Sequence, residues 1–73
     1  MELKIYSLEG TKYEGTVPQV SLPATDGEIT VLPHHIALIT TLKEGKIKFK
    51  DQTVTINGGF AEIGNNKVVV LVN

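Results

Sequence analysis

Two adjacent histidines and two nearby carboxylates are the side chains of this sequence whose types and spacing are best suited to chemistry. His34 and His35 carry imidazole nitrogens that bind metals, but neighbouring residues of a strand point to opposite faces and no further ligands cluster nearby. Asp26 and Glu28 resemble a general acid–base pair, yet they flank a glycine in a turn that we expect to be exposed. We therefore predict no metal, no cofactor and no small-molecule substrate, and we interpret these side chains as surface or contact residues.

Lysines occupy every second position of residues 46–50, which places all three on one face of a strand. Such a stripe could contact phosphates. However, all basic residues of the chain are lysines, so no arginine supplies the bidentate fork that phosphate recognition favours, and the formal net charge is −1. Lysines on a solvent face also protect an edge strand from aggregation. We interpret the stripe as a solvated face and predict no binding of nucleic acid.

The remaining patterns also point away from catalysis. There is no Ser, His and Asp arrangement at a nucleophile elbow, and Gly58-Gly59 is too short to cradle a phosphate. The 73 residues contain no cysteine, so neither a disulfide nor a thiolate metal site can staple the chain. No apolar run approaches the roughly 20 residues needed to span a bilayer. We predict a single domain over residues 1–73 that is not an enzyme.

The dominant hydrophobic period is two, and turn residues interrupt it every eight to twelve positions or so, as in β-sandwiches and barrels. We expect strands near residues 3–7, 12–17, 19–22, 28–32, 36–42, 46–50, 54–56, 60–63 and 67–72. Residues 23–27 are predicted to form a loop, and the apolar residues 36–42 a segment buried on both faces. The pair Gly58-Gly59 predicts a bulge or a close backbone approach.

The fold class that follows is all-β, a small antiparallel β-sandwich of about eight to ten short strands, because two sheets can each bury one face against the other. Its core is predicted to be mainly aliphatic. The predicted core residues are Leu3, Ile5, Val20, Leu22, Ile29, Val31, Leu38, Leu42, Ile47, Phe49, Val54, Ile56, Phe60, Val68, Val70 and Val72.

Several fixed points from Glu28 onward resemble one known family. In order, they are an acidic residue with a strand (residues 28–31), Leu32-Pro33, His35, Leu38-Ile39-Thr40, Leu-Lys-x-Gly at residues 42–45, Gly58-Gly59-Phe60 and Val-Leu-Val at residues 70–72. This order is similar to that of the amino-terminal β-sandwich domain of the epsilon subunit of F-type ATP synthase. The likeness covers nearly the whole chain and is weak before Leu22.

The resemblance implies a non-catalytic rotor subunit that links the gamma subunit to the membrane c-ring and supports the coupling of ion translocation to ATP synthesis. By position in the motif, Asp26, Gly27, Glu28 and Ile29 correspond to the loop that contacts the c-ring. The positions that face gamma are Ser7, His35, Ile36 and Thr40. The implied location is peripheral, on the cytoplasmic side of a bacterial inner membrane or the stromal side of a thylakoid membrane.

The chain departs from the family pattern at some of these positions. Family members usually have Gly-His-Ala-Pro where this chain has residues 34–37, and a glycine where Thr30 stands. They commonly continue into two helices that restrain ATP hydrolysis. From the end of the sequence at Asn73 we expect a form that lacks this helical domain and its inhibition. The alternative interpretation is a free-standing β-sandwich module that binds a peptide, a saccharide or an acidic polymer.

Overall fold

The computed structural model describes residues 1–34 and 37–73 and contains nine strands. They are β1 (Glu2–Ser7), β2 (Gly10–Thr16), β3 (Val20–Ala24), β4 (Gly27–Val31), β5 (Leu38–Leu42), β6 (Gly45–Phe49), β7 (Gln52–Ile56), β8 (Gly59–Gly64) and β9 (Lys67–Val72). The predicted all-β class and strand number are therefore confirmed. No helix in the described ranges is long and apolar enough to cross a membrane.

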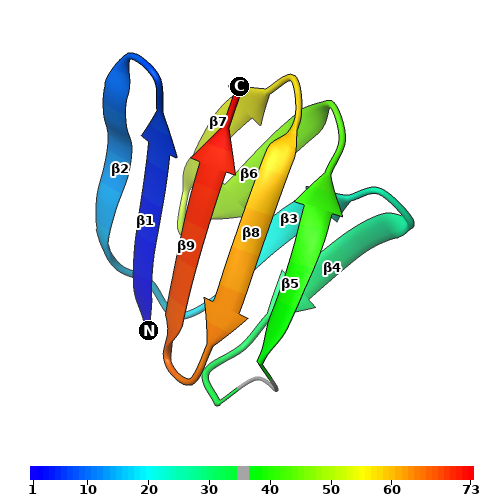
Figure 1. The fold of residues 1–73 in the computed structure, drawn as a ribbon. Coiled ribbons are helices and arrows are strands. Elements are labelled where there is room, and N and C mark those ends of the chain that lie inside the picture. Colours follow the sequence, from blue (N-terminus) through cyan, green and yellow to red (C-terminus); the bar gives the residue numbers. More distant parts are fainter. Residues whose placement is uncertain (35–36) are drawn as a thin grey trace.

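The strands form one continuous sheet that curls over on itself into two layers (Figure 1). The strand order is β2-β1-β9-β8-β5-β3-β6-β7, and β4 pairs with the free edge of β3. The curl lies between β5 and β3, where the ladder is reduced to a single pair, Ala24 with Leu42. The front layer is therefore β2-β1-β9-β8-β5, and the back layer is β4-β3-β6-β7.

One strand pairing differs from the predicted antiparallel arrangement. Strand β1 runs parallel to β9, with Leu3 opposite Val68 and Ile5 opposite Val70. Strand β9 therefore lies between β1 and β8, at the centre of the front layer (Figure 1). A parallel neighbour cannot be read from a period-two pattern, because the alternation of side chains is the same for both strand directions.

The core lies between the inner faces of the two layers and is almost entirely aliphatic. Twelve of the predicted core residues are buried, and Ile29 and Val54 pack against the cluster with partial exposure. The core also contains residues that the sequence analysis did not select: Met1, Val17, Ala24, Ala61 and Ile63. No side-chain nitrogen or oxygen of the described residues is buried without a hydrogen-bond partner.

Two core predictions are wrong. Phe60 is 46% exposed, because Ala61 and Ile63 set the phase of β8 and turn Phe60 to the outer face. Leu38 is 42% exposed at the beginning of β5. The segment 36–42 is accordingly not buried on both faces, since Ile39 is 68% exposed, while Ile36 lies outside the described residues. Size and hydrophobicity suggested burial, whereas strand phase decided it.

The predicted loop at residues 23–27 is mostly strand. Strand β3 continues through Pro23 to Ala24, and β4 begins at Gly27, so the connection is a two-residue turn of Thr25 and Asp26. Pro23 lacks an amide donor, but its carbonyl oxygen accepts a hydrogen bond from the amide of Lys43 at 2.9 Å. A proline is therefore tolerated at this position, because the hydrogen bond made there uses its carbonyl oxygen and not an amide proton.

Gly59 confirms the predicted close backbone approach at the start of β8. Its φ is 146°, and a Cβ at this position would overlap the carbonyl oxygen of Leu71 on the neighbouring strand β9. By contrast, Gly10 also has a positive φ, 122°, but a Cβ there would meet nothing within 4 Å. An alanine at Gly10 would therefore meet only backbone strain, whereas an alanine at Gly59 would meet both backbone strain and a steric overlap.

We predict that Gly59→Ala is far more damaging than Gly10→Ala. Gly10→Ala should lower the unfolding free energy by about 1–3 kcal/mol, the usual cost of a strained backbone conformation. Gly59→Ala adds the overlap with Leu71 and should leave a domain with roughly 5 kcal/mol of stability largely unfolded. Urea denaturation followed by circular dichroism measures both, and equal losses would show that the β8–β9 contact can relax.

Candidate docking surfaces

The acidic turn that was predicted to contact a partner is the tip of the β3–β4 hairpin, and it is tied to strand β5. The amide of Thr25 donates to the carbonyl oxygen of Thr41 at 3.1 Å, and the two threonine hydroxyls lie 2.7 Å apart. Asp26 is exposed next to this attachment, and Gly27 has a φ of 135° with open space around it. The tip therefore presents the Asp26 carboxylate on a backbone that is hydrogen-bonded to strand β5.

Glu28 and Ile29 belong to strand β4 and point to opposite sides of it. The carboxylate of Glu28 lies 3.5 Å from Nζ of Lys48 on β6, and both side chains are about half exposed. Ile29 packs against the core cluster instead. Of the four residues assigned to this contact, Asp26 and Glu28 present charge to solvent, Gly27 shapes the backbone, and Ile29 supports the strand from inside.

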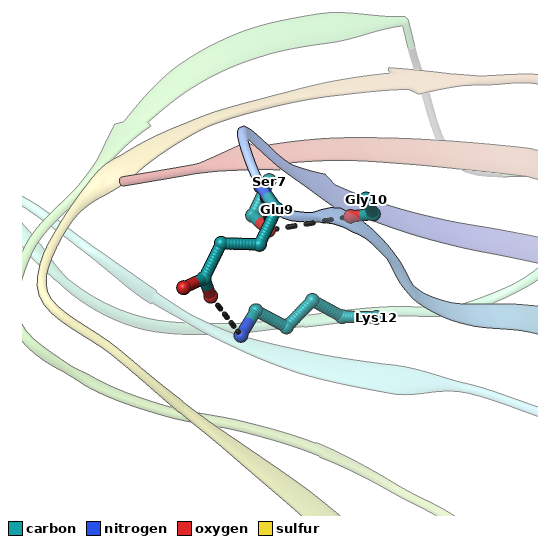
Figure 2. Close-up of polar contacts among 4 residues, drawn as sticks. All are labelled: Ser7, Glu9, Gly10 and Lys12. Atoms are coloured by element: carbon teal, nitrogen blue, oxygen red, sulfur yellow. Dashed lines mark hydrogen bonds and ion pairs between the residues drawn. The ribbon is translucent and has the colours of Figure 1, made fainter.

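Ser7 ends strand β1 at the β1–β2 hairpin, and its hydroxyl is used within the turn (Figure 2). The Oγ atom accepts a hydrogen bond from the amide of Glu9 at 3.2 Å and donates one to the carbonyl oxygen of Gly10 at 3.2 Å. Glu9 in turn lies 3.6 Å from Nζ of Lys12. A serine that bonds its own backbone in this way stabilises a tight turn.

Of the other predicted gamma contacts, the structure describes Thr40, which lies on β5, separated from β1 by β9 and β8. Thr40 is half-buried on β5, on the opposite side of the strand from Ile39 and Thr41, and its hydroxyl donates to the Thr41 carbonyl oxygen at 3.4 Å. His35 and Ile36 lie outside the described residues. His34 is exposed, with a φ of 67°, and its Nδ1 lies 3.1 Å from Oδ1 of Asn65.

The outer face of the front layer carries an apolar surface that the sequence analysis did not identify. Strand register places Tyr6, Leu71 and Phe60 side by side on β1, β9 and β8. The next row along the strands places Val69 beside Glu62, and Glu62 beside Ile39. We name this surface the apolar outer face; it consists of Tyr6, Ile39, Phe60, Val69 and Leu71. Two shallow depressions lie on it, one at each end of the strands.

The outer face of the back layer has the opposite character. Lys46, Lys48 and Lys50 are all exposed, as predicted for a solvated stripe. Beside them lie exposed threonines of β4 and β7, and the hydroxyls of Ser21 and Thr30 are 3.2 Å apart. The outer face of the back layer is therefore polar, whereas that of the front layer carries the apolar residues together with Lys4 and Glu62. Large exposed apolar patches on soluble domains mark interaction sites.

The apolar outer face was missed because its residues were assigned to the core or ignored. Phe60 was counted as buried, and Val69 and Leu71 were hidden in an unbroken apolar run over β9. The signal available in the sequence was that run itself, since a strand that is apolar at successive positions needs cover on both faces. No group of three or more histidine, aspartate or glutamate side chains suited to a metal occurs within residues 1–34 and 37–73.

These features define a small all-β domain with an apolar face, a polar face and an acidic tip that is hydrogen-bonded to strand β5. Comparison with known proteins identifies the family to which this domain belongs. The family described as "ATP synthase, Delta/Epsilon chain, beta-sandwich domain" matches residues 1–73, and the chain belongs to this family. The resemblance found in the sequence is therefore confirmed.

Individual relatives agree with this assignment. The ATP synthase epsilon chain of Prochlorococcus marinus (strain MIT 9515) is 40% identical over 77 residues, which cover 100% of this chain and 58% of the relative. That of Endomicrobium trichonymphae is 45% identical over 74 residues, or 96% of this chain and 54% of the relative. The chain thus spans little more than half the length of these relatives.

Solved structures confirm the fold at low sequence identity. A chain in the central stalk/c-ring structure of the Tetrahymena thermophila mitochondrial ATP synthase superposes with a TM-score of 0.84 at 13% identity, covering 99% of this chain and 62% of that one. A chain of the Euglena gracilis mitochondrial enzyme gives 0.85 at 19% identity, covering 96% and 48%.

We predict that Thr25→Val loosens the acidic tip. The substitution keeps the side-chain shape but removes the hydroxyl bonded to Thr41, which should lower the unfolding free energy by about 0.5–1.5 kcal/mol. Amide hydrogen exchange at Asp26 and Gly27 should accelerate as well. The matched control is Thr53→Val on edge strand β7, where Thr53 is exposed and its hydroxyl has no hydrogen bond with the described residues. Equal effects of the two substitutions would contradict a special role for the attachment.

Proposed function

We propose that this chain is a non-catalytic central-stalk subunit of an F-type ATP synthase, which joins the gamma subunit to the membrane c-ring and so supports coupling of ion flow to ATP synthesis. Membership of the ATP synthase delta/epsilon family is the observation that carries the proposal. Within the complex, the domain is peripheral to the membrane, on the cytoplasmic or stromal side.

The apolar outer face is the part of the surface best suited to the gamma contact. It crosses four strands of the front layer and contains the exposed side chains of Ile39, Phe60 and Leu71. Stable interfaces of about 1,600 Å² have apolar centres with polar rims. Here Lys4 and Glu62 lie among the apolar residues and can supply polar contacts. The polar outer face offers no comparable apolar centre.

The acidic tip is the part of the surface best suited to the c-ring. Asp26 is exposed at the end of a hairpin, and the Thr25–Thr41 hydrogen bond holds that hairpin in place. A carboxylate in this position can pair with basic residues on the polar loops of the ring. Because Glu28 is already close to Lys48, its contribution would come from exchanging one cationic partner for another.

The mechanism of such a subunit is mechanical. Torque that passes between the ring and gamma is lost in a soft element, whereas a close-packed interior resists deformation. The aliphatic core between the two layers supplies that stiffness. The alternative of a free-standing module for an acidic polymer has less support, since the central lysine of its stripe is paired with Glu28.

We predict that Ile39→Lys weakens binding to the gamma subunit by more than about tenfold, because it would bury an ammonium group in an apolar interface. The isolated domain should remain folded, since Ile39 is 68% exposed and a lysine there lies opposite Glu62. The matched control is Thr30→Lys, which adds the same charge to the polar outer face. Calorimetric titration with gamma measures both variants, and equal affinities would remove the apolar outer face from the interface.

We predict that Glu28→Lys lowers c-ring binding and proton-driven ATP synthesis in an epsilon-depleted complex reconstituted with this chain, because it places like charges opposite the basic loop. Glu14→Lys is an unusually close control. Glu14 is also 54% exposed and also lies near a lysine, Lys4, at 3.6 Å, but on edge strand β2. If the complex with Glu28→Lys binds the c-ring and synthesises ATP as well as the complex with Glu14→Lys, Glu28 does not contact the ring.

A further inference from the structure

The tip of the β1–β2 hairpin places an aliphatic side chain in solvent. Leu8 is 102% exposed, more than any other large apolar side chain of the described residues. It occupies a two-residue turn, where glycine, asparagine and aspartate are the favoured residues, so turn chemistry does not explain a leucine there. Folding also gains nothing from it, because it packs against none of the core.

Leu8 borders the apolar outer face. Together with Tyr6, Ser7, Phe60 and Leu71 it lines the depression at that end of the strands. The apolar surface therefore does not stop at the edge of the layer but continues onto a projecting tip. A leucine that projects at this margin therefore adds exposed apolar area to a surface of the kind that marks interaction sites.

The turn that carries Leu8 is closed by hydrogen bonds among its own polar groups (Figure 2). The Ser7 hydroxyl has a single proton, and that proton is donated to the carbonyl oxygen of Gly10, while Oγ accepts from the Glu9 amide. Ser7 therefore cannot donate to a partner without releasing the turn. Ser7 is placed to orient Leu8 rather than to bond across an interface.

The charges at this tip indicate what kind of partner fits. Glu9 and Lys12 lie 3.6 Å apart and compensate each other, so the tip presents an aliphatic side chain without net charge. An anionic polymer or a charged lipid headgroup finds no unpaired cation among these tip residues. An apolar pocket on a folded protein is the complementary surface.

We propose that Leu8 is the anchor residue of the interface with the gamma subunit, inserted into an apolar pocket of gamma, and that Ser7 is a positioning residue that acts only through Leu8. This inference rests on the proposed function, because it takes gamma as the partner that covers the apolar outer face. It assigns the contribution of Ser7 to turn geometry instead of a direct contact.

A double-mutant cycle tests the inference. Binding of gamma to the 73-residue chain is measured for Leu8→Ala, Ser7→Ala and the double variant. Leu8→Ala should weaken binding by about tenfold or more, as for a typical anchor. Ser7→Ala should weaken it less, and should have no further effect once Leu8 is alanine. Ser7→Thr, which keeps the hydroxyl, should restore binding, and Gln52→Ala in the back layer should not change it.

A loss of binding by Leu8→Ala would not reflect unfolding, since Leu8 is fully exposed and the substitution should leave the thermal midpoint unchanged. Additive effects of Ser7→Ala and Leu8→Ala would overturn the positioning role. If Leu8→Ala binds normally while Ile39→Lys does not, the anchor is wrong and the proposed function stands. If the unaltered chain does not bind gamma, both fail. Leu8-dependent binding to phosphatidylcholine vesicles would show that the tip contacts lipid instead and would also overturn the inference.

Discussion

The contact between the inner faces of the two layers is the interaction on which the rest of this structure depends. With no disulfide and few aromatic residues, the chain is held by aliphatic side chains such as Leu3, Leu22 and Ile47, which are completely buried. The two layers belong to one sheet, and the ladder narrows to the Ala24–Leu42 pair where it curls. On the far side, the rings of Tyr13 and Phe49 meet with centroids 4.3 Å apart and join β2 to β6. A small domain thereby closes its core on both sides.

Closing the core in this way determines the two outer surfaces. Once the inner phase of each strand is fixed, every alternate residue must point outward, whatever its hydrophobicity. On β6 the outward residues are lysines, and on β8 and β9 they include Phe60, Val69 and Leu71. The difference between the faces therefore comes from the same alternation that builds the core, and an apolar outward residue is the part of the pattern that folding alone does not require.

Much of this architecture could be predicted from the sequence. Period two, turn residues and the Gly58-Gly59 pair indicated about eight to ten short strands and a bulge or a close approach before Phe60, and twelve core residues followed from alternation. The predictions failed where the local sequence pattern carries no information about strand pairing or burial. Strand direction in the β1–β9 pair, the pairing of β8 with β5, and the hydrogen bond from Lys43 to Pro23 all involve neighbours distant in sequence. The candidate contacts came from motif resemblance, whereas the apolar outer face needed the register of four strands.

The parallel pairing of β1 with β9 has a consequence for how such a subunit is made. Strand β9 is the last of the nine in sequence, yet it lies at the centre of the front layer, between the first strand and the eighth. Contacts between β1 and β9 close a loop of nearly the entire domain, which is the slow kind of step in β-protein folding. Tyr6 becomes a neighbour of Leu71 only after that step, whereas Phe60 meets Leu71 within the β8–β9 hairpin. A growing chain on the ribosome therefore exposes no finished apolar outer face, because the four strands that form it come together only when β9 has paired with β1.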